Sequence, residues 1–174
     1  MKRTFFSLAL LLAVATLTAQ TKMTAREAAV KIADRILAST TYEFKNTKTG
    51  EIYKSVKKLP LDMDVKVACK YNNWHYTNGV TNMALMELGD KLGDKKYEKY
   101  VLKNMNFVFN EGNLDFFRKQ YDEAFKRDGW NAVRKLSWHM IFRGKRLDDN
   151  GPMGASLIEL QLKYPNDSFL GYIK

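Results

Sequence analysis

One segment of the chain occurs twice in similar form, and this internal repeat constrains the fold more than any other feature. When the sequence is aligned with itself at one constant offset, without a gap, Asn78 pairs with Asn150 and Gly79 with Gly151. Self-similarity of this kind is typical of stacked supersecondary units, which bury their apolar faces against one another. The two copies therefore predict two helical hairpins, each with a helix, a polar turn and a second helix. The same shift pairs further identical residues: Leu85 with Leu157, Glu87 with Glu159, Leu88 with Leu160, Lys91 with Lys163 and Tyr100 with Tyr172.

Each copy places polar or aromatic side chains just ahead of its first helix. Trp74 and Tyr76 precede the first copy, and the shift puts them opposite Arg146 and Asp148 in the second. If equivalent helices pack in parallel, these residues gather at one end of the structure. The repeat thus predicts an all-α fold of α/α hairpins with a functional site at the helix starts.

The rest of the chain fits around this repeat. Residues 24–27 form a capping box, Thr-Ala-Arg-Glu, and apolar residues at helical spacing follow it, which predicts a helix there. Residues 40–70 are polar and irregular, and we expect a long loop with a short hairpin. Residues 81–92 predict the first helix of the first copy. Asp128-Gly129 predicts a turn in an insertion between the two copies. The second helix of the first copy carries expected core residues, which are Tyr97, Tyr100, Val101, Met105 and Val108.

The N-terminal segment predicts export. Positive residues at Lys2 and Arg3 precede an apolar run too short to span a membrane, and small residues near Ala19 offer a cleavage site. We interpret residues 1–19 as a signal peptide and expect a periplasmic or secreted protein without membrane attachment after cleavage. The single cysteine, Cys69, excludes an intramolecular disulfide, and we expect a buried thiol.

Composition indicates one globular unit with a basic surface. Hydrophobic residues make up 45% of the chain and aromatic residues 13%, which excludes a disordered protein. The formal net charge of +10 suits anionic partners. Because the chain is predicted to be exported, acidic polysaccharide is a better candidate than nucleic acid, for which no recognised binding module is present. Solvated lysines without any partner remain the alternative.

The segment 146–155 presents paired carboxylates where the second copy begins. Asp148, Asp149 or Asn150 can cap the first turn of a helix, and Pro152 is tolerated there because its missing N–H would have no partner. Capping and turn chemistry alone explain such a run. The functional interpretation makes Asp148 the catalytic carboxylate, with Arg146, Leu147 and Asp149 beside it in contact with substrate.

Residues 71–80 are dense in aromatic and amide side chains, which suits sugar binding. Trp74, His75 and Tyr76 offer flat apolar surfaces together with N–H and O–H groups. The alternative is a packing role for Trp74 and a solvated loop position for His75. Arg143 or Arg146 could pair with a substrate carboxylate through its forked guanidinium group. The sequence contains no Gly-rich phosphate loop or cysteine-pair zinc motif, so we expect neither a metal nor a cofactor.

Three motifs together resemble glycoside hydrolase family 105, the unsaturated rhamnogalacturonyl hydrolases. They are Trp-His-Tyr-x-Asn-Gly-Val at residues 74–80, Leu-Gly-Asp-Lys-Lys-Tyr at 92–97, and Leu-Asp-Asp-x-Gly-x-Met-Gly-Ala at 147–155. The resemblance covers most of the chain after the signal peptide. It implies a six-hairpin α/α toroid in which the starts of the inner helices surround a pocket.

The resemblance also implies an activity. Such enzymes remove a 4,5-unsaturated galacturonyl residue, left by a pectin lyase, by hydrating its C4=C5 double bond. Two aspartates take part: one matches Asp148, and the other belongs to a Trp-x-Asp-x-Leu-Tyr-Met motif that this sequence does not contain. We therefore expect residues 20–174 to be the N-terminal portion of such a domain, inactive alone. The alternative is a non-catalytic α/α-repeat module that binds acidic oligosaccharide.

Overall fold

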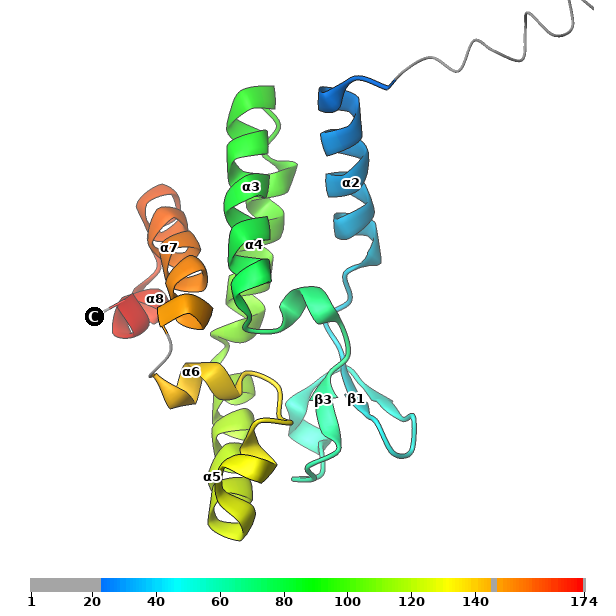
Figure 1. The fold of residues 1–174 in the computed structure, drawn as a ribbon, viewed down its shortest axis with the longest axis vertical. Coiled ribbons are helices and arrows are strands. Elements are labelled where there is room, and N and C mark those ends of the chain that lie inside the picture. Colours follow the sequence, from blue (N-terminus) through cyan, green and yellow to red (C-terminus); the bar gives the residue numbers. More distant parts are fainter. Residues whose placement is uncertain (1–22, 145–146, 174) are drawn as a thin grey trace, which may run out of the picture. The chain divides into compact units, whose positions relative to one another are not determined.

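The computed structural model describes residues 23–144 and 147–173, and of Glu111 and Asp149 only the backbone. The predicted signal peptide and Arg146 lie outside these ranges. The chain divides into two units at Ile32/Ala33, and each is described by itself. Most of the described chain is helical, as the repeat predicted (Figure 1). No helix in the described ranges combines the length and the apolar character that crossing a membrane requires.

Helix α2 (Ala25–Ser39) begins with the predicted capping box, in the first unit. The backbone N–H of Glu27 donates to Thr24 Oγ1 at 3.2 Å, and the N–H of Thr24 donates to Glu27 Oε2 at 2.8 Å. These hydrogen bonds lower the pKa of Glu27, because they stabilise its ionised form. The reciprocal bonds satisfy amides that the first turn leaves free, so the predicted helix start is confirmed.

A small antiparallel sheet follows α2, where the sequence predicted a loop with a hairpin. Strands β1 (Phe44–Asn46) and β2 (Ile52–Tyr53) form the hairpin, which confirms that part of the prediction. Strand β3 (Val65–Val67), which the sequence pattern did not predict, pairs with the other edge of β1. Two short 3-10 helices, Val56–Lys58 and Lys70–Asn72, complete the segment. The expectation of a largely structureless loop was therefore wrong: Phe44 and Val65 are buried and anchor the sheet.

Both copies of the repeat form a helix, a turn and a second helix. The first copy contains α3 (Tyr76–Leu92) and α4 (Lys96–Val108). The second contains α7 (Leu147–Lys163) and α8 (Asp167–Ile173). Helix α3 begins five residues before the predicted start at Thr81, because His75 caps it by accepting a hydrogen bond from the N–H of Thr77. The predicted core positions of α4, from Tyr97 to Val108, are all buried.

The first helices of the two copies lie side by side and run in parallel (Figure 1). Near their N-termini, the backbone of Gly79 in α3 meets the backbone of Pro152 and Met153 in α7. Toward their C-termini, Lys163 of α7 bonds Asp90 of α3 at 2.6 Å. Contact at corresponding positions near both ends establishes the parallel arrangement on which the expected site depended.

The insertion between the copies forms α5 (Glu111–Val133) and α6 (His139–Arg143). Asp128 and Gly129 interrupt α5 with non-helical backbone angles, and Gly129 has a φ of 53°. The predicted turn is thus confirmed as a kink. Trp138, which precedes α6, is buried and donates its indole N–H to the carbonyl of Asn72 at 2.7 Å. It ties the insertion to the segment that leads into α3.

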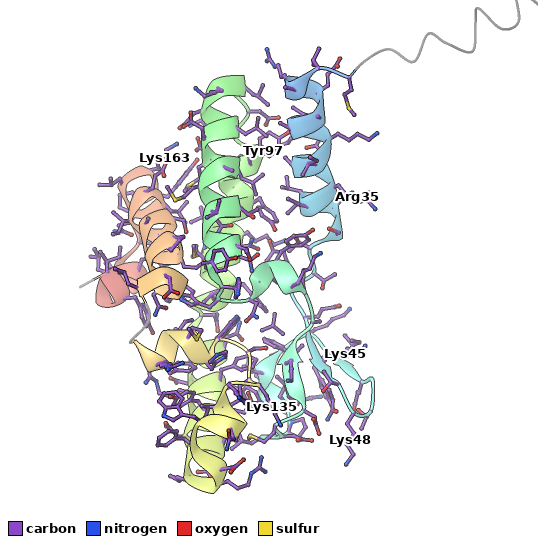
Figure 2. All side chains as sticks on the ribbon, in the orientation of Figure 1. Arg35, Lys45, Lys48, Tyr97, Lys135 and Lys163 are labelled. Atoms are coloured by element: carbon purple, nitrogen blue, oxygen red, sulfur yellow. The ribbon has the colours of Figure 1, made fainter. Side chains whose placement is uncertain are left out.

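The side chain of Tyr97 connects α4 to the part of α2 that belongs to the second unit. The hydroxyl of Tyr97, which is labelled in Figure 2, donates to Asp34 Oδ1 at 3.0 Å. The ammonium of Lys96 lies 2.9 Å from the same oxygen. These partners, with Lys96 first, lower the pKa of Asp34. Tyr97 itself is fully buried, so its hydroxyl has an acceptor where solvent does not reach.

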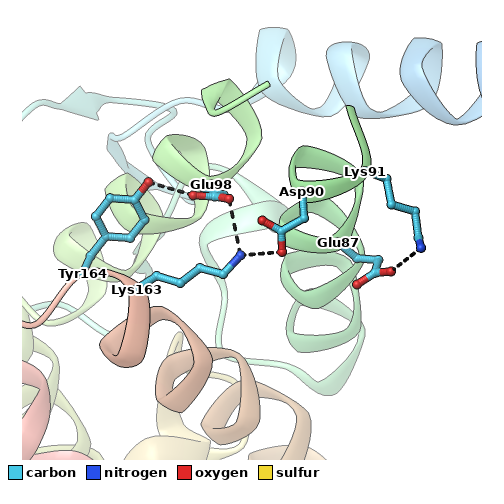
Figure 3. A network of polar contacts seen from close by, with 6 residues as sticks. All are labelled: Glu87, Asp90, Lys91, Glu98, Lys163 and Tyr164. Carbon is cyan, nitrogen blue, oxygen red and sulfur yellow. Dashed lines mark hydrogen bonds and ion pairs between the residues drawn. The ribbon is translucent and has the colours of Figure 1, made fainter. Parts of the chain in front are cut away.

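A polar network closes the C-terminal end of the α3–α7 interface (Figure 3). Lys163 bonds Asp90 and also lies 3.3 Å from Glu98 Oε1 of α4. The hydroxyl of Tyr164 donates to the other oxygen of Glu98 at 2.7 Å. The buried carboxylate of Glu98 thereby receives two donors. The Lys163 bond lowers the pKa of Asp90, while Asp90 raises that of Lys163.

Glycine at position 79 should be required by the α3–α7 contact. A Cβ atom there would lie 2.7 Å from the carbonyl oxygen of Pro152 and still closer to other backbone atoms of α7. We expect Gly79→Ala to destabilise the fold by about 1–3 kcal/mol, measured by chemical unfolding. The matched control is Gly154→Ala, whose Cβ would meet open space and which should stabilise α7 by up to about 1 kcal/mol. Equal effects of the two variants would contradict this account.

The network also predicts how stability depends on pH. Because the pKa of Asp90 is lowered in the folded protein, the folded state binds fewer protons there than the unfolded chain. The stabilisation is present above the unfolded pKa of about 4 and is lost as pH falls through the folded value. Asp90→Asn should flatten the fall in melting temperature below about pH 4. Glu87→Gln, which breaks an exposed ion pair with Lys91, should leave that fall unchanged.

Candidate functional site

The starts of the two repeated helices are joined by a side-chain hydrogen bond. The indole N–H of Trp74, just before α3, donates to Asn150 Oδ1 in the first turns of α7 at 2.7 Å. The Trp74 ring is buried and packs edge-on against Phe109, with ring centroids 5.6 Å apart. Trp74 therefore has the packing role that the sequence left open, and only part of it reaches the surface of a neighbouring cavity.

The other predicted residues of the first copy lie at the exposed start of α3. His75 is exposed, and its Nδ1 lies 2.9 Å from the hydroxyl of Thr77. Tyr76 is the first residue of α3 and is 47% exposed. Their rings are 4.7 Å apart and tilted, so together they form a small aromatic surface.

The second copy corrects one local prediction. Helix α7 begins at Leu147, so Asp148, Asp149 and Asn150 lie inside the helix and do not precede it as caps. Pro152 is correspondingly inside the helix, and its missing N–H leaves the carbonyl of Asp148 without its usual intrahelical donor. The predicted cap was wrong because Asp-Asp-Asn-Gly-Pro is rich in residues that favour turns. The packing of α7 against α3 outweighs that local preference.

Of the site residues predicted at 146–149, the structure describes the side chains of Leu147 and Asp148. Both are exposed in the first turn of α7. The side chain of Asp149 and the whole of Arg146 lie outside the described structure.

A cavity of about 430 Å³ opens beside the joined helix starts. Its lining combines the segment before α3 with the end of α5 and with α6, and it carries two arginines, two histidines and two tryptophans but no carboxylate among the described residues. The lining residues are Asn73, Trp74, His75, Trp130, Arg134, His139, Met140 and Arg143.

Arg143 is held against an aromatic ring of the cavity lining. Its guanidinium carbon lies 4.5 Å from the centre of the Trp130 ring, which is a cation–π arrangement. Its Nε is buried and has no hydrogen-bond partner among the described residues. An arginine held by stacking keeps its forked N–H groups for another acceptor.

His139 also reaches this cavity in a defined orientation. Its Nδ1 lies 2.8 Å from the carbonyl of Leu136 and, because a carbonyl only accepts, must donate to it. In the neutral form of the ring, this hydrogen bond leaves Nε2 as an acceptor, which suits a sugar hydroxyl. Within residues 23–144 and 147–173, no three His, Cys, Asp or Glu residues converge as a metal site would require.

The sequence predicted part of this site. Trp74, His75 and Arg143 were predicted, whereas Trp130 and Arg134 were treated as parts of an insertion. The kink at Asp128-Gly129 redirects the end of α5 toward α6 and so supplies both. The sequence predicted the turn, but it did not predict the direction in which the chain continues after it.

Other surface features suit a specific acidic ligand less well. A larger cavity of about 620 Å³ is lined by residues of both charges, and its Lys126 already pairs with Glu123 at 3.1 Å. Lys45 and Lys48 on the hairpin of the sheet are exposed (Figure 2). They agree with the basic surface but line no described pocket, so they fit the alternative of solvated lysines.

Comparison with known proteins found no protein-family model that matches the chain and no matching curated protein.

The Trp74–Asn150 hydrogen bond should couple the two repeats energetically. Trp74→Phe removes the donor and keeps an aromatic ring, and Asn150→Ala removes the acceptor. Each should lower the free energy of unfolding by about 1–3 kcal/mol, and the double variant by less than the sum, with about 0.5–1.5 kcal/mol of coupling. Trp130→Phe, at an exposed ring, is the control and should not couple to Asn150→Ala. Strict additivity of Trp74→Phe and Asn150→Ala would exclude a structural role for the bond.

Proposed function

We propose that this chain binds an acidic oligosaccharide ending in an unsaturated galacturonyl residue, as the N-terminal portion of an α/α-toroid hydrolase similar to glycoside hydrolase family 105. The two helix pairs would be successive hairpins of that toroid. The observation that carries the proposal is the cationic and aromatic cavity beside the joined starts of two parallel repeated helices. After removal of residues 1–19, the chain would act in the periplasm or outside the cell.

The lining of the cavity fits the chemistry of such a sugar. A volume of about 430 Å³ is within the usual range for small-ligand sites. Arg143, stacked on Trp130, can bind a carboxylate through two parallel N–H groups. His139 can accept a hydrogen bond from a hydroxyl, and the aromatic rings offer flat faces to the sugar.

Asp148 would take part in the hydration step. Its carboxylate is exposed in the first turn of α7, so it would orient water or hold a sugar hydroxyl. A second acid must then protonate the ring carbon at C4 while water adds at C5. General acid–base catalysis contributes about 10²–10⁴ in rate, so the 174-residue chain, which lacks the second motif, should turn over little or no substrate.

A second candidate is a non-catalytic repeat module that holds the same acidic sugar. The absence of a carboxylate from the described lining of the cavity favours it, because binding an anion needs cations and no acid–base pair. The loss of ultraviolet absorbance of the double bond separates the two functions. A longer chain with the second aspartate would consume the unsaturated disaccharide if the hydrolase proposal is right, and would only bind it if the module is right.

Binding can be tested on the chain itself by titration calorimetry with an unsaturated rhamnogalacturonan disaccharide. We expect Arg143→Ala to weaken binding at least about tenfold, because a charged hydrogen bond contributes about 1.5–3 kcal/mol. Arg143→Lys should recover part of the loss, since it keeps charge but not the fork.

Arg118→Ala is the matched control for this experiment. Arg118 also stacks on an aromatic ring, that of Phe142, but does not line the cavity. Its removal should leave affinity unchanged. Absence of binding by the unsubstituted chain, or equal loss in the two arginine variants at equal melting temperature, would contradict the proposal.

A further inference from the structure

A series of aromatic rings on α5 and α6 continues from the cavity that contains Arg143. The Trp130 ring, which lines that cavity, meets Phe125 edge-on, with ring centroids 5.5 Å apart. Phe125 stacks on Tyr121 with an angle of 4° between the rings, and Tyr121 packs in turn against Phe142 of α6. An arginine lies over the first ring of the series and another over the last. These side chains form the aromatic patch: Arg118, Phe142, Tyr121, Phe125, Trp130 and Arg143.

Helical spacing explains why the patch forms. Arg118, Tyr121 and Phe125 are three and four residues apart on α5, so they share one face of the helix. At about 1.5 Å per residue, they span roughly 10 Å along the helix axis. The kink at Asp128-Gly129 then brings Trp130 against Phe125. The patch therefore extends well beyond the ring that lines the cavity.

Much of this surface is open to solvent. Phe125 is 44% exposed, Trp130 is 45% exposed, and Arg118 is also exposed. In the part of the chain that the structure describes, neither Arg118 nor Arg143 forms an ion pair, although Asp122 follows Tyr121 on the same helix. An exposed aromatic surface bordered by charged groups is typical of a binding site.

The patch offers the same chemistry as the cavity. The guanidinium carbon of Arg118 lies 4.9 Å from the centre of the Phe142 ring, which repeats the arrangement of Arg143 on Trp130. Each stacked arginine can bind a carboxylate through its forked N–H groups. Burial raises the pKa of Tyr121, and the positive charge of Arg143 opposes that shift only in part. The phenol thus keeps its proton at neutral pH and can donate to a sugar oxygen.

We propose that the aromatic patch binds the next acidic sugar residues of a longer oligosaccharide whose unsaturated end occupies the cavity. Arg143 then binds the carboxylate of the terminal residue, and Arg118 binds a carboxylate further along the sugar chain. Tyr121 and Phe125 stack on the sugar residues between them. Because Trp130 and Arg143 belong to both surfaces, one ligand can contact the cavity and the patch together.

This inference rests on the proposed function and adds a preference for chain length. Titration calorimetry with an unsaturated rhamnogalacturonan tetrasaccharide, beside the disaccharide, tests it. The tetrasaccharide carries a second carboxylate and should bind at least about tenfold more tightly. Arg118→Ala should remove most of this gain and leave disaccharide binding unchanged, and Phe125→Ala should remove part of the gain. Both side chains are exposed, so the melting temperature should change little.

Arg127→Ala is the matched control for Arg118→Ala. Arg127 is also an exposed arginine of α5, but it lines a different cavity and stacks on no ring among the described residues. Its removal should leave both affinities unchanged. Equal affinity for the two oligosaccharides, or an equal loss of the gain in the two arginine variants, would overturn the inference and leave the proposed disaccharide binding intact.

The remaining outcomes separate the inference from the proposed function. If neither oligosaccharide binds, both are wrong. If only the tetrasaccharide binds, and Arg118→Ala abolishes that binding, the patch is a binding site and the role proposed for the cavity is wrong.

Discussion

The close backbone approach of α3 to α7 at Gly79 is the constraint on which the rest of the structure depends. Only the absence of a Cβ lets Pro152 and Met153 come so near, and this approach sets the depth to which the two helices interlock. The apolar residues Leu157 and Leu160 of α7 are then fully buried beside α3 and α4. Lys163 reaches the carboxylates of Asp90 and Glu98 only in this register.

The same contact assembles the candidate site. Parallel packing in this register brings the segment before α3 level with the first turns of α7, where Trp74 bonds Asn150. The buried indole then fixes one wall of the cavity, and Trp138, held by the carbonyl of Asn72, fixes the chain that enters α6. Cationic side chains from α5 and α6 complete the lining, so a site for an anionic ligand rests on rigid elements.

The polar groups of the structure fall into two kinds with different consequences. At the C-terminal end of the α3–α7 interface, carboxylates and Lys163 neutralise one another, and that end contributes to folding. At the N-terminal end, Arg143 stacks on Trp130, and its Nε has no hydrogen-bond partner among the described residues, which suits it to an anionic ligand. The C-terminal end of the interface therefore stabilises the repeat, and the N-terminal end is suited to binding an anionic ligand.

The sequence by itself determined the features that depend on local pattern: the duplicated helix pair, the capping box at Thr24, the core face of α4 and the turn at Asp128-Gly129. It misplaced the starts of α3 and α7, because cap and turn residues compete there and packing decides between them. It missed β3, whose three residues are too short for a periodic signal. Only tertiary structure decided that Trp74 is buried and that Trp130 and Arg134 join the cavity, because these depend on where distant segments meet, and no spacing along the chain encodes that.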